Sequence, residues 1–181
     1  WRAVQYLKEI YHVPESKMAM IHHGIPDTPF VDPNFYKDQF GVEGRFVLLT
    51  FGLLSPNKGL EYMIEALHRV VQAYPNVVYI ILGETHPNVK REQGETYRLK
   101  LQQRVRELKL ETHIIFMNRF VELNELCEYL GCADIYLTPY LNPAQAVSGT
   151  LAYAMGTGKA VVSTPYWYAE DMLSEGRGRL V

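Results

Sequence analysis

Two short stretches of the sequence contain the residue types that hold phosphate groups. Ser148, Gly149 and Thr150 open a helical pattern soon after an apolar segment, and Lys58 lies in a glycine-bounded loop, residues 52–59. The first N–H groups of a helix have no partner within the helix and carry partial positive charge, so they attract anions. A lysine beside them adds a compact cation. These residues predict a binding site for a diphosphate.

Each of these assignments has a simpler alternative. By spacing alone, Lys58 is equally well explained as a solvated lysine in an ordinary turn. Gln145 lies just ahead of the helical pattern, and Tyr153 lies one to two turns inside it. The Tyr153 hydroxyl could reach a ligand beyond the phosphates, but a buried tyrosine that only completes the core is a strong competitor.

Two further loops offer groups that could contact a ligand. Gly83 follows an apolar run and would allow close approach of a ligand, as Gly52 would in the first loop. Asn118 and Arg119 follow another apolar run and supply an amide and a guanidinium, as a pocket for a nucleotide base would need. Arg119 could instead pair with Glu122 on the surface.

The elements that must position these loops follow from hydrophobic periodicity. Short apolar runs predict strands, and runs with apolar residues at i, i+3, i+4 and i+7 predict helices between them. Continuous apolar strands alternating with amphipathic helices indicate an α/β fold, a Rossmann-like doubly wound parallel sheet covered on both faces. Ligands of such sheets bind outside the carboxyl ends of the strands. The predicted strands are 46–51, 77–82, 113–117, 135–137 and 160–163, and the predicted helices lie around 60–71, 97–108 and 126–130.

The N-terminal part is less regular. We expect a helix over residues 2–11, a short strand at 18–21, a connector at 22–27 and a short helix opened by Asp32 and Pro33 that runs through Phe40. Asn57 is expected to cap the helix after the first strand, and residues 83–92 are expected to form a long polar connector. The final residues, 180–181, look like the beginning of another strand.

Composition narrows the range of partners. The 181 residues carry a formal net charge of −2 and are 48% hydrophobic, which argues against nucleic acid or an anionic membrane as the main partner. No apolar run approaches the roughly 20 residues that a transmembrane helix needs. Neither of the two cysteines, Cys127 and Cys132, has the histidine or cysteine neighbours that a metal site would need. They are expected to be buried, reduced thiols, which favours a cytoplasmic location.

Three familiar motifs are excluded. The segment 156–159, GTGK, resembles part of a P-loop, but it is expected to run from a helix into a strand rather than from a strand into a helix. No Gly-x-Gly-x-x-Gly follows a predicted strand, so a nicotinamide enzyme has no support. No Gly-x-Ser-x-Gly nucleophile motif is present either.

Five segments together resemble the C-terminal half of the family 4 retaining glycosyltransferases. They are residues 21–27 (IHHGIPD), 52–59 with Lys58, 116–120, 133–135 (ADI) and 151–164, so the resemblance covers nearly the whole chain. It implies the GT-B arrangement, in which two Rossmann-like domains face each other. Residues 1–27 would then be the exit from an acceptor-binding domain outside this chain, and residues 28–181 a nucleotide-sugar-binding domain truncated at its C-terminus.

The resemblance also implies roles for particular residues. Lys58 would neutralise the donor diphosphate, the N–H groups of residues 148–150 would hold it, and Asn118 and Arg119 would border the base. Gln145 and Tyr153 stand where the family commonly has two glutamates that contact the donor sugar and the ribose. No metal and no cofactor other than the nucleotide-sugar donor would be needed, because a lysine and a helix N-terminus stabilise the leaving group. Attachment of the full-length protein to a membrane surface is compatible with this assignment.

Other departures from the family pattern keep alternatives open. Leu53 stands where an arginine is common, and Tyr166, Trp167 and Tyr168 replace a Gly-Gly pair. The leading hypothesis is retaining transfer of a hexose to an acceptor held by the absent domain, with no transfer by this chain alone. The alternative is a non-catalytic nucleotide-sugar-binding or interaction module. An epimerase of the same architecture would need an acidic pair that is not found here.

Overall fold

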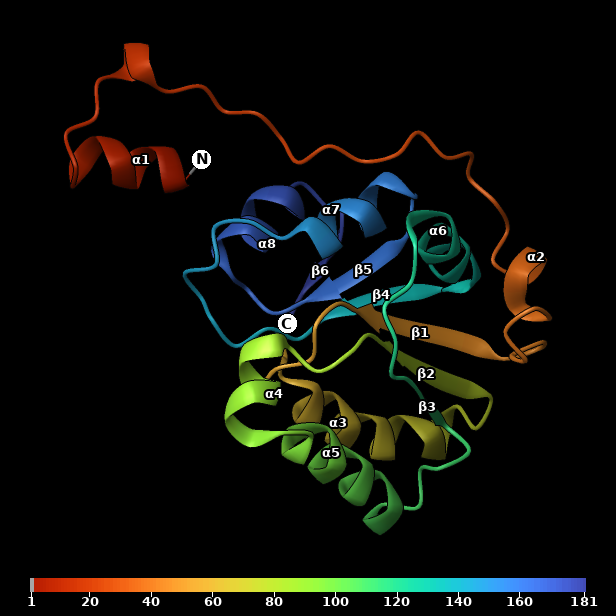
Figure 1. The fold of residues 1–181 in the computed structure, drawn as a ribbon. Helices are drawn as coiled ribbons and strands as arrows, with labels where there is room; N and C mark the ends of the chain where they lie inside the picture. The colour runs from red at the N-terminus through yellow and green to blue at the C-terminus, as the bar shows by residue number, and fades with distance from the viewer. Residues whose placement is uncertain (1) are drawn as a thin grey trace.

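The computed structural model describes residues 2–181 and contains one six-stranded parallel sheet (Figure 1). The strand order is β3-β2-β1-β4-β5-β6, and each neighbouring pair is parallel. This is the doubly wound α/β fold that the periodicity predicts. The strands are β1 (Phe46–Phe51), β2 (Val77–Leu82), β3 (Ile114–Met117), β4 (Ile135–Thr138), β5 (Ala160–Ser163) and β6 (Arg179–Leu180).

The winding direction reverses between β1 and β4. From β1 the chain proceeds outward through β2 to β3, then returns to the other side of β1 to form β4, β5 and β6. Helices α3 and α7, which follow β1 and β4, therefore lie on opposite faces of the sheet, and doubly wound sheets bind their ligands in the crevice at such a point. These are the two loops that carry Lys58 and Ser148.

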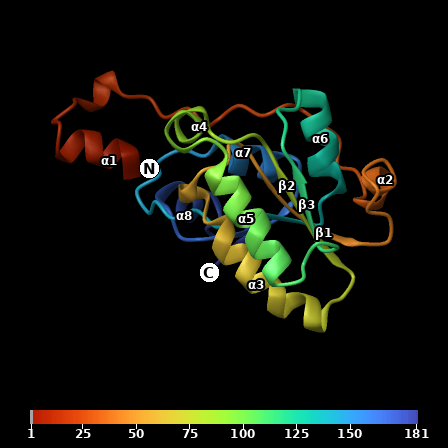
Figure 2. The same ribbon diagram turned by 60° about the horizontal axis from the view of Figure 1, so that its bottom comes forward.

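Helices cover both faces of the sheet. Helices α3 (Leu60–Ala73), α4 (Pro87–Gln93) and α5 (Thr96–Glu107) lie on one side, and α6 (Leu123–Cys132), α7 (Gly149–Gly156) and α8 (Trp167–Met172) lie on the other (Figures 1 and 2). The N-terminal segment contains α1 (Arg2–Glu9), a 3-10 turn (Glu15–Lys17) and α2 (Asn34–Lys37). Its long connector passes over the α7 side of the sheet (Figure 1).

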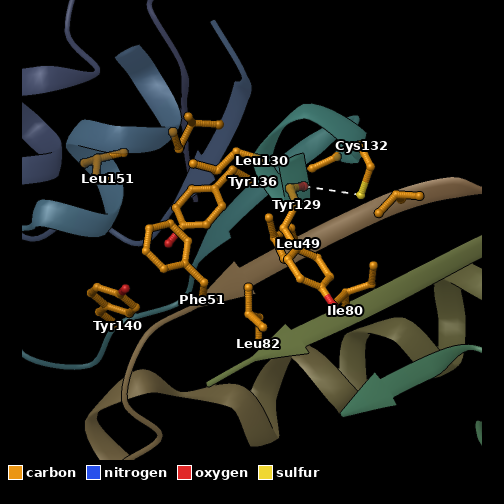
Figure 3. Packing of buried hydrophobic residues seen from close by; sticks show 14 of the residues in the cluster. Leu49, Phe51, Ile80, Leu82, Tyr129, Leu130, Cys132, Tyr136, Tyr140 and Leu151 are labelled. Carbon is orange, nitrogen blue, oxygen red and sulfur yellow. Dashed lines mark hydrogen bonds between the residues drawn. The ribbon is translucent and has the colours of Figure 1, made fainter. Parts of the chain in front are cut away.

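Each face of the sheet has its own apolar core because side chains alternate along a strand. Val47, Leu49 and Phe51 of β1 face α6 and α7, where they meet Tyr129 and Leu151 (Figure 3). On the other face, Leu48 of β1 and Tyr79 of β2 belong to the cluster that includes Leu60 and Ile64 of α3. Both layers are fully formed, so the loops at the sheet edge rest on a rigid base.

Four local predictions are wrong. Residues 18–21 form no strand, because they are extended without a partner strand in the described chain, and Ile21 is 89% exposed. The polar stretch 83–92 contains most of α4, because Pro87 occupies its first turn and the His86 ring nitrogen accepts a hydrogen bond from Asn88 N–H at 3.2 Å. Asn57 does not cap α3, since it lies in a 3-10 turn and Gly59 takes the cap position. The short helix α2 ends at Lys37, before Phe40.

The connector is anchored along the outer face of α7 by close approaches to glycines. A Cβ atom on Gly156 would lie 2.0 Å from a methyl group of Ile25, and one on Gly158 would lie 3.0 Å from the Phe30 ring. Further along the chain, the Lys37 ammonium pairs with Asp134 at 2.8 Å, and the same carboxylate accepts the Val47 N–H at 2.7 Å. Asp134 thus ties α2 to the sheet and has a structural role.

Candidate functional site

The loops after β1 and β4 are packed directly against each other at the crevice. Gly59 has a left-handed backbone with φ of 61°, and a Cβ atom there would lie 2.1 Å from the Pro139 carbonyl oxygen. The Leu141 N–H donates to the Asn57 carbonyl at 3.0 Å. Only glycine combines this φ with this contact, so Gly59 brings the two loops together and fixes Lys58 beside the start of α7.

Lys58 points into the crevice. Its Nζ donates a hydrogen bond to the Tyr140 hydroxyl at 2.6 Å and lies 4.0 Å from the centre of the Tyr140 ring. Burial lowers the pKa of Lys58 from its ordinary value to about 8, because the ammonium form loses hydration. Lys58 is thus partly buried and hydrogen-bonded within the protein, which the solvated-lysine interpretation does not predict.

A chain of hydroxyl groups continues from Tyr140 to the N-terminus of α7. The Tyr140 hydroxyl lies 2.7 Å from Thr150 Oγ1, which lies 3.1 Å from Ser148 Oγ. Ser148 is the N-cap residue of α7, and its Oγ accepts the Leu151 N–H at 3.2 Å. The N–H groups of Gly149 and Thr150 precede the first hydrogen bond inside the helix. They remain available to an anion.

Gly52 keeps the space between the lysine and the helix open. Its φ is 118°, and a Cβ atom there would lie 3.3 Å from both Lys58 Nζ and Thr150 Cγ2. A longer side chain would fill the gap that separates the cation from the helix start. Lys58 Nζ and the start of α7 thus both lie beside Gly52, close enough to contact one diphosphate.

His23 of the connector lies against the start of α7. A Cβ atom on Gly149 would lie 2.9 Å from its Nε2, and its Nδ1 is 2.7 Å from the Gly24 carbonyl oxygen. The imidazole ring also packs edge-on against Tyr153, with the ring centres 5.7 Å apart. The absence of a side chain at Gly149 therefore makes room for this histidine.

Gln145 and Tyr153 lie at the site but are already engaged. Gln145 Nε2 donates to the Val147 carbonyl at 3.0 Å. The Tyr153 ring packs between His23 and Phe51, whose ring centre is 6.4 Å away. Neither residue supplies the negative charge that a carboxylate at the same place would bring.

At the other end of the crevice is an open hollow of about 210 Å³ beyond the ends of β1, β2 and β3. It is lined mainly by apolar groups, with Arg119 at its border, and Phe120 is 72% exposed. Arg119 pairs with Glu125 through both guanidinium NH2 groups, one contact being 2.8 Å, and not with Glu122. Asn118, the residue before Arg119, is exposed and does not line the hollow.

Gly83 lines the same hollow, but contact with a neighbouring backbone segment explains why glycine is needed at this position. A Cβ atom on Gly83 would lie 2.1 Å from the Gly52 carbonyl oxygen, so the loops after β1 and β2 touch here. The glycine therefore permits close approach of protein backbone, whereas the sequence suggested a ligand. The hollow remains large enough for an aromatic ring.

The remaining chemistry-bearing residues have structural explanations. Lys159 of the P-loop-like segment is buried, and its Nζ donates to the carbonyls of Gly131 and Ala133 at 3.0 and 3.3 Å. Cys132 is buried, which raises its pKa to about 12, while Cys127 is only partly buried. Residues 2–181 contain no cluster of three or more histidine, cysteine, aspartate or glutamate side chains that could hold a metal ion. No helix in the same range is long and apolar enough to cross a membrane.

Sequence reasoning missed Tyr140 and His23. Tyr140 lies two residues past the end of β4 in the loop already singled out, so its position at the sheet edge was a usable signal. Tyrosine at such a place is ordinarily explained by packing, and Tyr140 is indeed stacked on Tyr166 with ring centres 5.4 Å apart. His23 carried no comparable signal, because its approach to α7 depends on the path of the connector.

A doubly wound sheet with a cation and a helix N-terminus facing each other at its switch point defines a Rossmann-like domain of the GT-B glycosyltransferase type. The chain belongs to the family described as "Glycosyl transferases group 1", whose sequence profile matches residues 45–181.

Relatives with known names agree with this assignment. The chain is 27% identical over 167 residues to the phosphatidyl-myo-inositol mannosyltransferase of Mycolicibacterium smegmatis. That match covers 92% of this chain and 39% of the mannosyltransferase, so the chain spans about two fifths of that relative. It is also 29% identical over 103 residues to a putative glycosyltransferase of Bacillus subtilis, YtcC, a match that covers 56% of this chain and 24% of YtcC.

Solved structures show the same fold. The Anabaena protein Alr3699/HepE, crystallised with UDP and glucose, is 26% identical with a TM-score of 0.70, and the match covers 83% of this chain and 38% of that chain. The C-terminal domain of the Francisella tularensis group 1 glycosyltransferase LpcC superimposes with a TM-score of 0.72 at 22% identity, over 87% of this chain and 80% of that domain. The second comparison bears on the fold alone.

Proposed function

We propose that this chain is the donor-binding domain of a retaining glycosyltransferase and holds a nucleotide-diphosphate sugar for transfer of a hexose. The observation that carries the proposal is the placement of Lys58 and the N-terminus of α7 around one space, linked through the Tyr140 hydroxyl. Both elements stabilise negative charge, and both lie where ligands of doubly wound sheets bind.

In the transfer step, the bond between the sugar C1 and the diphosphate oxygen breaks, and its electron pair leaves with the diphosphate. The acceptor oxygen bonds to C1 and gives up its proton. Lys58 and the N–H groups of Gly149 and Thr150 would stabilise the charge that develops on the leaving group. This chemistry calls for no metal ion, since the protein supplies the positive charge itself.

The nature of the donor is supported by two observations. The hollow bordered by Arg119 and lined by Gly83 suits a nucleobase, at the opposite end of the crevice from Lys58. HepE, at 26% identity, was crystallised with UDP and glucose, which favours a UDP-linked hexose. Asn118 would lie beside the base, and Gln145 would face the sugar with its amide.

We also assign residues 1–27 to contact with an acceptor-binding domain, with residues 28–181 as the donor domain. Helix α1 buries none of its residues, and the apolar residues Tyr6 and Leu7 within it and Ile10 just after it are 42–55% exposed. Residues of this kind pack well against a second domain. The acceptor would then be held by that domain, and a cytoplasmic location follows from the nucleotide-sugar donor.

The test is nucleotide titration of the intact protein by thermal melting. UDP, GDP and ADP at about millimolar concentration, free and with a sugar attached, are added separately. Binding to the native state raises the melting temperature by mass action. An unchanged melting temperature with all six compounds would rule out the proposed function.

A second candidate, a non-catalytic nucleotide-sugar-binding module, is favoured by the state of Gln145 and Tyr153. Both side chains are engaged within the protein, and neither carries a charge for the sugar carbon. The two candidates separate in the full-length protein through release of UDP from UDP-sugar in the presence of acceptor. Binding without turnover supports the module, and turnover that Lys58→Ala abolishes supports the enzyme.

A further inference from the structure

The contact between Lys58 and Tyr140 stands apart from the other polar contacts of the crevice. Tyr140 is 3% exposed, and its hydroxyl accepts a hydrogen bond from Lys58 Nζ at 2.6 Å. Tyr140 leaves the sheet just after β4 and lies at the end of the core cluster next to Phe51 (Figure 3). The partly buried ammonium group of Lys58 therefore donates to a buried hydroxyl.

The direction of the hydrogen bonds follows from the charge of Lys58. An ammonium group can only donate, so the Tyr140 oxygen accepts from it and the Tyr140 hydrogen can go to Thr150 Oγ1, 2.7 Å away. Thr150 can in turn donate to Ser148 Oγ at 3.1 Å. When Lys58 is protonated, the hydroxyl chain is therefore polarised from the lysine toward the N-terminus of α7.

We infer that Tyr140 is a positioning residue for Lys58: its hydroxyl holds the ammonium group beside the start of α7 and sets the pH range over which the diphosphate site carries its charge. This inference rests on the proposed function. The Tyr140 ring also helps to hold the ammonium group, which lies 4.0 Å from the ring centre in a cation–π contact.

Few other groups around Lys58 could position its ammonium group or set the pH range of its charge. Its pKa is lowered by burial, without a contribution from a charged neighbour among residues 2–181. The tyrosines packed around Tyr140, namely Tyr136 from β4 and Tyr166 after β5, have pKa values raised by burial and stay neutral where Lys58 titrates. Thr150 and Ser148 on α7 do not titrate. Removing the Tyr140 hydroxyl would thus leave the ammonium form without its acceptor.

The first test measures Lys58 directly and needs no nucleotide. Lysine is labelled with 13C at Cε, the Lys58 signal is assigned by its absence in Lys58→Arg, and its shift is followed from about pH 6 to pH 11. We expect a midpoint of about 8 in the wild type. In Tyr140→Phe, which keeps the ring, we expect a midpoint lower by about one unit. Equal midpoints would overturn the inference.

A matched control and a second variant keep this test decisive. Tyr97→Phe also removes a hydroxyl, one that donates to Glu61 at 2.8 Å on the α3–α5 face of the sheet, and should leave the Lys58 midpoint unchanged. Thr150→Val removes the group that accepts the Tyr140 hydrogen and should lower the midpoint in the same direction as Tyr140→Phe. If Tyr140→Phe fails to fold, an unchanged midpoint in Thr150→Val overturns the inference by itself.

The second test is the pH profile of UDP affinity by calorimetry. For Tyr140→Phe, we expect affinity about threefold weaker near pH 7.5, because a midpoint lower by about one unit leaves about a third as much Lys58 protonated, and we expect the difference to shrink toward pH 6 as Lys58 regains its proton. Equal weakening at every pH would indicate a merely structural role and contradict the inference. If the wild type binds none of the three nucleotides, the proposed function fails, while the NMR comparison still decides the role of Tyr140.

Discussion

At the diphosphate end of the crevice, Lys58, Tyr140, Thr150 and Ser148 form one connected set of hydrogen bonds. At the base end, Phe120 lies exposed and the Arg119 guanidinium is neutralised by Glu125. The first end is joined by hydrogen bonds before any ligand arrives, whereas the second offers an exposed aromatic ring and a guanidinium that is already paired. Because preorganised groups bind without loss of side-chain freedom, we expect the diphosphate to dominate affinity and the base to add little.

The largest effect should come from breaking the contact that assembles the diphosphate end. Gly59→Ala places a methyl group 2.1 Å from the Pro139 oxygen and strains a φ of 61°, so we expect a loss of about 3 kcal/mol in unfolding free energy by urea denaturation. Gly41→Ala is the control, since its φ is 66° and nothing lies within 4 Å; it should lose about 1 kcal/mol. Similar losses in both variants would show that the loop contact contributes nothing.

Removing the cation at the same end should be the next largest change. Lys58→Ala should weaken UDP binding about tenfold to hundredfold by calorimetry, because a charge-assisted hydrogen bond to the diphosphate is lost. Lys100→Ala, which removes an exposed lysine from α5, should change the affinity less than twofold. An unaltered affinity in Lys58→Ala would show that Lys58 does not contribute to UDP binding.

The pH dependence of binding and of stability should have opposite signs. Lys58 loses its charge above its pKa of about 8, so UDP affinity should fall by up to about tenfold between pH 7 and pH 9. Between this pKa and the ordinary value of 10.5, the unfolded chain binds more protons than the native protein, so stability rises with pH. Relative to Lys58→Met, the wild type should gain about 1–2 kcal/mol from pH 8 to 9.5. A gain of the opposite sign would mean that Lys58 is stabilised as a cation.

The smallest effect is expected at the base end. Arg119→Ala should change UDP affinity less than about threefold, since Glu125 already neutralises the guanidinium. Glu125→Gln sharpens the test, because it frees Arg119 for the ligand and should strengthen binding by a similar factor. A tenfold loss in Arg119→Ala would show that the base end is as well organised as the diphosphate end.

The strand predictions succeeded where the local pattern of apolar residues was enough to identify a strand. The five strands predicted from residue 46 onward are present, with boundaries within one residue, because continuous apolar runs between amphipathic helices require a covered parallel sheet. The strand at 18–21 failed for the converse reason. An extended apolar segment becomes a strand only when another strand pairs with it, and the described chain offers none there.

The two halves of the site were predictable to different extents. Lys58 and residues 148–150 were found because strand-end loops of a doubly wound sheet converge, a rule that needs only the order of elements. Arg119 was placed correctly after β3, but its partner Glu125 lies one turn into α6 rather than at position 122. Choosing between these glutamates requires the direction in which the side chains leave the helix.

The sequence by itself determined the layered α/β fold, the loops that gather at the carboxyl end of the sheet and the family resemblance, because periodicity and loop residues act over short distances along the chain. Only the tertiary structure decided that Tyr140 links Lys58 to α7, that His23 lies on Gly149 and that Gly83 faces backbone. Those contacts join residues far apart in sequence, and they depend on how two loops pack after the sheet has formed.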